Sequence, residues 1–135
     1  MSADLEAIIR LKHLYGLIVD GMCSGEYSPA DLAQVLTADA RLAYPPPTGE
    51  RTGLEAIVPF FDQIRLARSA SWHNFGNPVI DIDGDTARGR WTVMARHTTR
   101  GEDAHTGVAY GRYAERYLRT PDGWRIAELV YSREP

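Results

Sequence analysis

The stretch Val79-Ile-Asp-Ile-Asp-Gly-Asp-Thr-Ala87 decides the fold, because it places an Asp-Gly turn between two runs with strand-like alternation. From about residue 70 to the C-terminus, apolar residues alternate with polar ones, which indicates strands. Beyond the hairpin, the pattern predicts strands over 90–98, 108–119 and 124–133. The C-terminal half is therefore predicted to form a sheet of consecutive antiparallel strands.

The N-terminal half has helical spacing instead. Apolar side chains recur every three or four residues from Leu5 to about Val19, and Gly21 then breaks the pattern. The predicted elements of this half are, in order, a helix over 5–19, a short helix over 30–36, a strand over 41–44, and a helix with capping-box spacing at Thr52-Gly-Leu-Glu55 that runs to about Ala67. Helices first and strands last favour an α+β domain, with helices covering one face of a curved antiparallel sheet.

Composition and charge exclude several classes of protein. The 135 residues suffice for a single domain over 1–135, and 44% hydrophobic with 24% charged residues is typical of a globular protein. The net charge of -3 argues against nucleic-acid binding, and no apolar run approaches the roughly 20 residues of a membrane span. Cys23 is the only cysteine, so no intrachain disulfide can form. We expect a cytoplasmic protein that binds neither nucleic acid nor membranes.

Three residues form a candidate proton-transfer set. Asp20 ends an otherwise uncharged run late in the first predicted helix, and His73 lies where a strand enters the sheet. Tyr15 shares a helical face with interior apolar residues. A carboxylate that holds one imidazole nitrogen leaves the other free to take a proton. The alternatives are that Asp20 caps local backbone near Gly21, that His73 is an ordinary strand-edge histidine, and that Tyr15 is a core tyrosine.

Other polar and aromatic residues are candidates for binding a substrate. His97 continues the strand face of Trp91 and could line a cavity. The aromatic candidates, for which a plain core position is the alternative, are Tyr44, Trp72, Trp91, Tyr110 and Tyr131. His13 and His105 are expected to face water or lie in a loop, and the histidines are too scattered for a metal site. Nothing in the sequence indicates a cofactor.

The order of elements and several local signatures resemble the nuclear transport factor 2-like fold and, within it, the SnoaL-like group. The matching segments, which span nearly the whole chain, are Leu14-Tyr-Gly-Leu-Ile-Val-Asp20, Thr37-Ala-Asp39, Gly53-Leu-Glu-Ala-Ile57, His73-Asn-Phe-Gly-Asn-Pro-Val-Ile80, Asp83-Gly-Asp-Thr-Ala87, residues 107–113 and Asp122-Gly-Trp-Arg-Ile126. The resemblance implies a cone-shaped α+β barrel whose curved sheet wraps around N-terminal helices. It also implies a ligand held between the sheet and the helices.

The candidate site is similar to that of bile acid 7α-dehydratase, and scytalone dehydratase pairs an Asp with a His in the same fold. Tyr15 and Asp20 have the spacing of the former enzyme's catalytic Tyr and Asp, and His73 opens the matching strand. Arg133 follows a Tyr by two residues, as that enzyme's arginine does, which implies an anion or oxyanion contact. The alternative for Arg133 is a solvated strand-end arginine. A further Asp of that enzyme falls at Ala95 here.

The resemblance implies a cofactor-independent lyase of the dehydratase type, acting on a hydrophobic cyclic, steroid- or polyketide-like carbonyl compound. His73 would abstract the proton, Asp20 would orient His73, and Tyr15 with Arg133 would stabilise the enolate or the departing group. One alternative is a ketosteroid-isomerase-like or polyketide-cyclase-like enzyme with Asp20 as the base. Another is a non-catalytic ligand-binding or assembly module. The fold often pairs through its open sheet face, so a homodimer is expected.

Overall fold

The computed structural model describes residues 2–134, and its elements follow the predicted order of helices and strands. The helical elements are α1 (Ala3–Gly21), the short 3-10 helix η1 (Pro29–Gln34) and α2 (Leu54–Ala67). The strands are β1 (Leu36–Ala43), β2 (Glu50–Thr52), β3 (Arg68–Asp83), β4 (Thr86–Thr99), β5 (Thr106–Thr120) and β6 (Gly123–Arg133). The predicted α+β class is confirmed.

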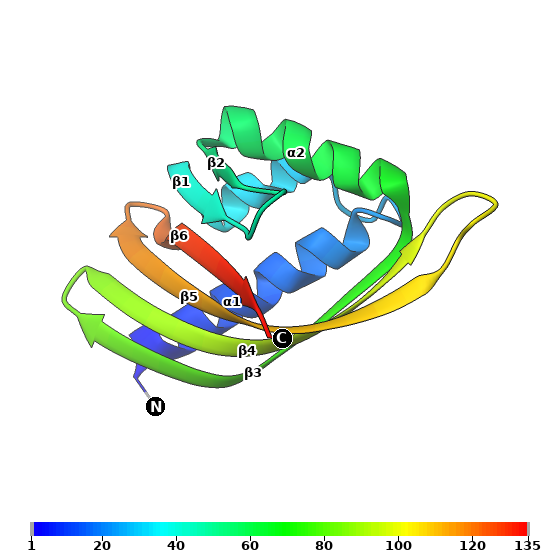
Figure 1. The fold of residues 1–135 in the computed structure, drawn as a ribbon. Helices are drawn as coiled ribbons and strands as arrows, with labels where there is room; N and C mark the ends of the chain where they lie inside the picture. The colour runs from blue at the N-terminus through cyan, green and yellow to red at the C-terminus, as the bar shows by residue number, and fades with distance from the viewer. Residues whose placement is uncertain (1, 135) are drawn as a thin grey trace.

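The six strands form one curved sheet in the order β2-β1-β6-β5-β4-β3. Neighbouring strands are antiparallel except β1 and β6, which are parallel, so the prediction of an antiparallel sheet is wrong at that pair. Figure 1 shows α1 lying in the concave side of the sheet, with α2 near β1 and β2. The sheet stays open, and β3 is one of its two edges. This edge strand carries His73.

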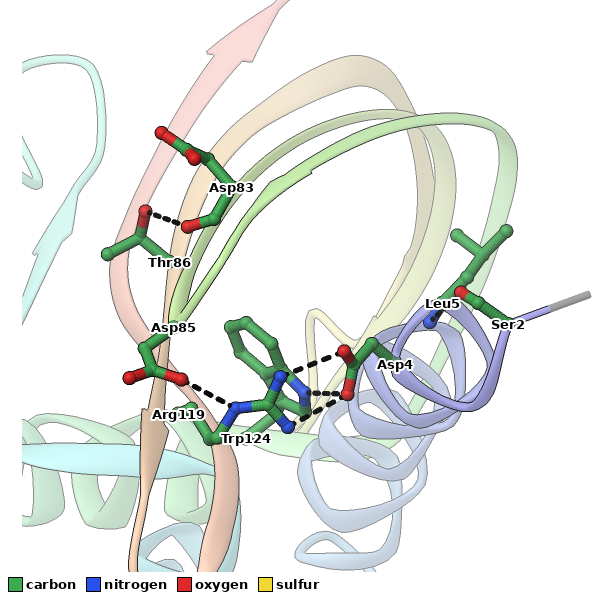
Figure 2. Close-up of polar contacts among 8 residues, drawn as sticks. All are labelled: Ser2, Asp4, Leu5, Asp83, Asp85, Thr86, Arg119 and Trp124. Atoms are coloured by element: carbon green, nitrogen blue, oxygen red, sulfur yellow. Dashed lines mark hydrogen bonds and ion pairs between the residues drawn. The ribbon is translucent and has the colours of Figure 1, made fainter.

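Hydrogen bonds at its first turn fix the position of α1. The Ser2 hydroxyl caps the helix by accepting the Leu5 N–H at 3.1 Å. Asp4 accepts two hydrogen bonds of 2.8 Å from Arg119 of β5 and one of 3.1 Å from the Trp124 indole of β6 (Figure 2). These bonds, those from Arg119 above all, lower the pKa of Asp4 to about 2. The start of α1 is therefore held against β5 and β6.

The hairpin that decides the fold forms as predicted. Asp83 of β3 pairs with Thr86 of β4, and Gly84 in the turn has a φ of 61°, which glycine adopts without steric cost. β3 begins earlier than expected, at Arg68, directly after α2. It bends at Asn77, whose φ is 51°, where the pairing register with β4 shifts. The long edge strand therefore follows the curve of the sheet.

Three local expectations are corrected. Residues 30–36 do not form an α-helix: η1 is a 3-10 helix that ends at Gln34, and β1 begins at Leu36, earlier than the predicted strand. The expected capping box is absent, since Thr52 belongs to β2 and Gly53, with a φ of 84°, occupies the N-cap of α2 without a side-chain bond. The short strand β2 itself was not expected.

One apolar core joins the helices to the inner face of the sheet. Its fully buried members come from the three helical elements and from β1, β5 and β6, and include Ile8, Ile18, Leu32, Leu42, Ile57, Tyr117, Ile126 and Leu129. Among residues 2–134, no helix is long and apolar enough to cross a membrane.

Candidate active site

The register between α1 and β3 brings the candidate residues together. Gly16 and Asp20 are four residues apart and share one helix face, while His73 and Phe75 are two apart and share one face of the edge strand. Gly16 packs so closely on Phe75 that an added Cβ would lie 2.6 Å from the ring. This close approach allows Asp20, one turn further along the helix, to reach His73.

Asp20 and His73 form a hydrogen-bonded pair. The Asp20 Oδ1 atom lies 2.6 Å from the His73 Nδ1 atom, and Oδ2 accepts the backbone N–H of His73 at 2.9 Å. The Ser71 hydroxyl donates to Oδ1 at 3.1 Å. A carboxylate can only accept, so Nδ1 carries a proton and, in the neutral imidazole, Nε2 is left as the acceptor. The side chains of His73 and Asp20 are 10% and 17% exposed, which shields the pair from most water without sealing it.

His97 adds a second imidazole to the site. Its Nδ1 atom lies 3.4 Å from the Ser71 hydroxyl, and its ring centroid lies 5.3 Å from that of His73. Burial, and then the nearby charge of Arg68, lowers the pKa of His97 to about 4. At neutral pH His97 is therefore uncharged, and it can donate a hydrogen bond from one ring nitrogen and accept one at the other.

His73 forms part of the wall of a cavity of about 360 Å³, within the size range of small-molecule sites. The wall is mostly aromatic and aliphatic, with residues from both helices and from strands β3 to β6. The lining residues are Tyr15, Val19, Tyr44, Thr48, Phe60, Phe61, Ile64, Arg68, His73, Ala95, His97, Ala109, Tyr113, Tyr131 and Arg133. Such a cavity suits an apolar ligand that is oriented by a few polar groups.

Of the four phenols that line this cavity, three have strongly raised pKa values. Burial raises the pKa values of Tyr15 and Tyr113 well above the usual range, and it raises the pKa of Tyr44 to about 12. All three therefore stay protonated at neutral pH. A phenol O–H can stabilise negative charge on a substrate oxygen, which is the role expected for Tyr15.

The cavity brings together most of the predicted site residues. Tyr15, His73, His97 and Arg133 line it together with Tyr44 and Tyr131, and Asp20 lies behind His73. Asp20 and His73 also border an outer, more open hollow of about 420 Å³.

Three predicted cavity residues lie elsewhere. Trp72 is 52% exposed and borders the outer hollow, and Tyr110 is 59% exposed on the outer face of β5. Successive strand residues point to opposite faces, so Trp72 cannot point inward beside His73. Trp91 points inward but is buried in the core, where its indole donates to the Tyr117 hydroxyl at 3.0 Å.

The sequence reasoning missed a fully buried ion pair. Lys12 and Glu115 have no exposed side-chain area, and the Lys12 Nζ atom lies 2.5 Å from Glu115 Oε2. The ammonium sits 3.6 Å from the centroid of the Tyr113 ring and 4.7 Å from that of Tyr15, behind two cavity phenols. The signal was available, since Lys12 lies four residues after Ile8 on the buried helix stripe.

No group of three or more metal-ligating side chains comes together within residues 2–134. The chemistry that this part of the chain offers is proton transfer by a carboxylate-oriented imidazole, next to phenol donors.

Comparisons with known proteins agree with the fold. The SnoaL-like domain family matches residues 1–130. The uncharacterized protein Rv2910c of Mycobacterium tuberculosis is 29% identical over 103 residues, which cover 76% of this chain and 70% of that protein.

Three solved structures of low sequence identity share the architecture. The dehydrochlorinase LinA-type3 from Novosphingobium barchaimii, which is named for hexachlorocyclohexane, is 18% identical with a TM-score of 0.82, covering 98% of this chain and 88% of that one. A proposed scytalone dehydratase from Novosphingobium aromaticivorans is 23% identical with a TM-score of 0.85, covering 97% and 84%. A nuclear transport factor 2-like superfamily protein from Salmonella enterica is 19% identical with a TM-score of 0.84, covering 96% and 90%. At these identities the structures establish a common fold.

Proposed function

Because this chain belongs to the SnoaL-like domain family, we propose that it is a cofactor-independent lyase of the dehydratase type. Its substrate is a hydrophobic cyclic, steroid- or polyketide-like carbonyl compound with a leaving hydroxyl group. The observation that carries the proposal is the 2.6 Å contact between Asp20 and His73 at the wall of the 360 Å³ cavity. Dehydratase and dehydrochlorinase names among the structural neighbours are consistent with an elimination.

The proposed reaction removes water in two proton transfers through one imidazole. The Nε2 atom of His73 takes a proton from the carbon next to the carbonyl, and the C–H electron pair forms an enolate. The enolate then re-forms the carbonyl, a C=C bond forms, and the C–O bond to the hydroxyl group breaks. The imidazolium of His73 gives its proton to the departing hydroxyl, so water leaves and the histidine returns to its starting state.

Other cavity residues would stabilise the charges of this reaction. The carboxylate of Asp20 stabilises the imidazolium of His73, and the phenol of Tyr15 donates to the enolate oxygen. Arg133 lines the same cavity from the end of β6 and would contact an oxyanion or the departing group. A positioned base of this kind contributes about 10²–10⁴-fold to the rate.

The geometry disfavours the two alternatives. Both oxygens of Asp20 already accept hydrogen bonds from His73, and Ser71 adds a third, so Asp20 is poorly placed to act as the base of an isomerase or cyclase. A non-catalytic ligand-binding module would also need a cavity, but it would not need a close Asp–His pair in the cavity wall. The 2.6 Å pair therefore supports catalysis over simple binding.

The test is turnover of a panel of cyclic β-hydroxyketones, followed by mass spectrometry for a product that has lost one water. The His73→Ala variant is expected to lose about 10²–10⁴-fold in kcat/KM, while Asp20→Asn keeps the shape of the site but removes the charge. His105→Ala, at an exposed loop histidine, is the matched control and should turn over normally. Unchanged turnover in both site variants would exclude the pair as the catalytic machinery.

A further inference from the structure

Arg68 is an unused cation in the wall of the candidate active site. It is the first residue of β3, directly after α2, and its side chain lines the same cavity as His73. Within residues 2–134 its guanidinium forms neither an ion pair nor a side-chain hydrogen bond. By contrast, Arg41, Arg65 and Arg119 are paired with carboxylates. Arg68 therefore has free donors that face the cavity.

The charges that line the cavity are of one sign. Its wall contains two arginines, Arg68 and Arg133, and no carboxylate, because Asp20 lies behind His73. Arg133 likewise forms no ion pair with any residue of the described part, 2–134. Arg133 is exposed, but Arg68 is partly buried, and a positive charge there has less water to solvate it than at the open surface.

The charge of Arg68 affects the pKa values of two other residues of the cavity wall. Its charge helps to lower the pKa of His97, after burial, and it acts against the rise in the pKa of the Tyr44 phenol. Both of these residues line the cavity. Partial burial lowers the pKa of Arg68 itself, and none of the groups that oppose this shift is a carboxylate. Arginine nonetheless remains charged in proteins, so the site holds a permanent cation.

We propose that Arg68, in the same cavity wall as Arg133, binds an anionic oxygen group of the substrate. This inference rests on the proposed function and defines its substrate class more closely: a hydrophobic cyclic carbonyl compound that also carries a carboxylate or a phosphate. The planar guanidinium can donate two parallel hydrogen bonds to such a group. Binding there would orient the apolar ring of the substrate toward His73 and the phenols. Arg68 is accordingly a specificity-determining residue.

The test compares two probes that differ in charge. Isothermal titration calorimetry measures the dissociation constants of 2-naphthoate and of the neutral 2-naphthamide. The unmodified protein is expected to bind 2-naphthoate at least about tenfold more tightly, which corresponds to about 1.4 kcal/mol. In Arg68→Gln this ratio should fall close to one, through weaker binding of the carboxylate alone, and Arg68→Lys should give an intermediate ratio.

The control variant is Arg65→Gln. Arg65 precedes Arg68 by one helical turn but is paired with Asp62 at 2.7 Å and does not line the cavity, so this variant should keep the full preference. A third probe, 2-naphthyl phosphate, separates the two possible groups: tighter binding of the phosphate than of the carboxylate would identify a phosphate as the natural group. Arg68→Gln should also weaken the binding of 2-naphthyl phosphate.

Several results would overturn the inference. They are equal affinity of the unmodified protein for the charged and neutral probes, failure of both anionic probes to bind, or a preference that Arg68→Gln leaves unchanged. Because these are binding measurements, they separate this inference from the lyase proposal. Anion selectivity without turnover would exclude the lyase proposal but support anion binding by Arg68. Turnover without anion selectivity would support the lyase proposal but exclude anion binding by Arg68.

Discussion

Replacing Lys12 with methionine is expected to destabilise the fold more than any surface charge replacement. The ammonium of Lys12 and the carboxylate of Glu115 are fully buried and lie 2.5 Å apart. The other carboxylate oxygen accepts the Tyr117 hydroxyl at 2.6 Å. Methionine is unbranched like lysine and one heavy atom shorter, so Lys12→Met removes the charge with a small change in packing and leaves the Glu115 charge buried with a single donor.

The magnitude follows from the burial of the pair. Removing one partner of a buried ion pair costs about 3–5 kcal/mol, whereas replacing both partners with neutral groups is often close to neutral. The double variant Lys12→Met/Glu115→Gln keeps an acceptor for Tyr117 and leaves no net charge in the core. It should therefore be more stable than the Lys12→Met single variant. Since a domain of this size is stable by about 5–15 kcal/mol in total, the single variant should be close to its unfolding limit.

Urea unfolding followed by tryptophan fluorescence measures these differences. Arg41→Met is the control, because Arg41 pairs with Glu50 and Glu128 at the surface with its side chain 37% exposed, and it should cost about 0–1 kcal/mol. A cost of less than about 1 kcal/mol for Lys12→Met, or additive costs in the double variant, would refute the view that this pair is a coupled, buried charge system.

Three further predictions concern the site. The pKa of His97 is about 4 when folded and 6.5 in its ordinary state, so the unfolded chain binds more protons between these values and stability should fall as pH drops from 6.5 to 4. Urea unfolding of His97→Gln across this range should show a shallower fall, by up to about 3 kcal/mol, and an unchanged slope would contradict the burial of a neutral imidazole. Ser71→Ala removes a donor from Asp20 and should lower kcat/KM about tenfold, because a hydrogen bond to a charged group contributes about 1.5–3 kcal/mol; an unchanged kcat/KM would count against its positioning role. Gly16→Ala should cost about 1–3 kcal/mol through contact with Phe75, partly offset by better helix propensity, and calorimetry showing a more stable protein would contradict the close α1–β3 contact.

Local signals were sufficient to predict much of the fold. The Asp-Gly hairpin and the alternating strands depend on short-range turn chemistry and a period of two, and the structure has them where expected. The parallel pairing of β1 with β6 could not be predicted in this way, because it joins residues nearly ninety positions apart along the chain (for example Arg41 with Glu128). The edge position of β3 depends on the same long-range order.

The candidate site was predicted in part. The resemblance to known enzymes pointed to Asp20 and His73, and the structure brings them together. Helix periodicity alone gave no partner for Asp20, because its contact depends on how closely Gly16 allows α1 to approach the edge strand. Because neighbouring residues of a strand point to opposite faces, an inward His73 would have excluded Trp72 from the predicted cavity wall. The position of Arg68 could not be predicted, because the sequence does not show which strand begins at the cavity wall.

The proposed reaction depends most on Asp20 holding His73 in the tautomer that a base requires. Nitrogen-15 NMR of the histidine side chains at neutral pH measures this directly. We predict that the neutral ring of His73 carries its proton on Nδ1 and that Asp20→Ala removes this preference. A neutral His73 ring that carries its proton on Nε2 would contradict this assignment.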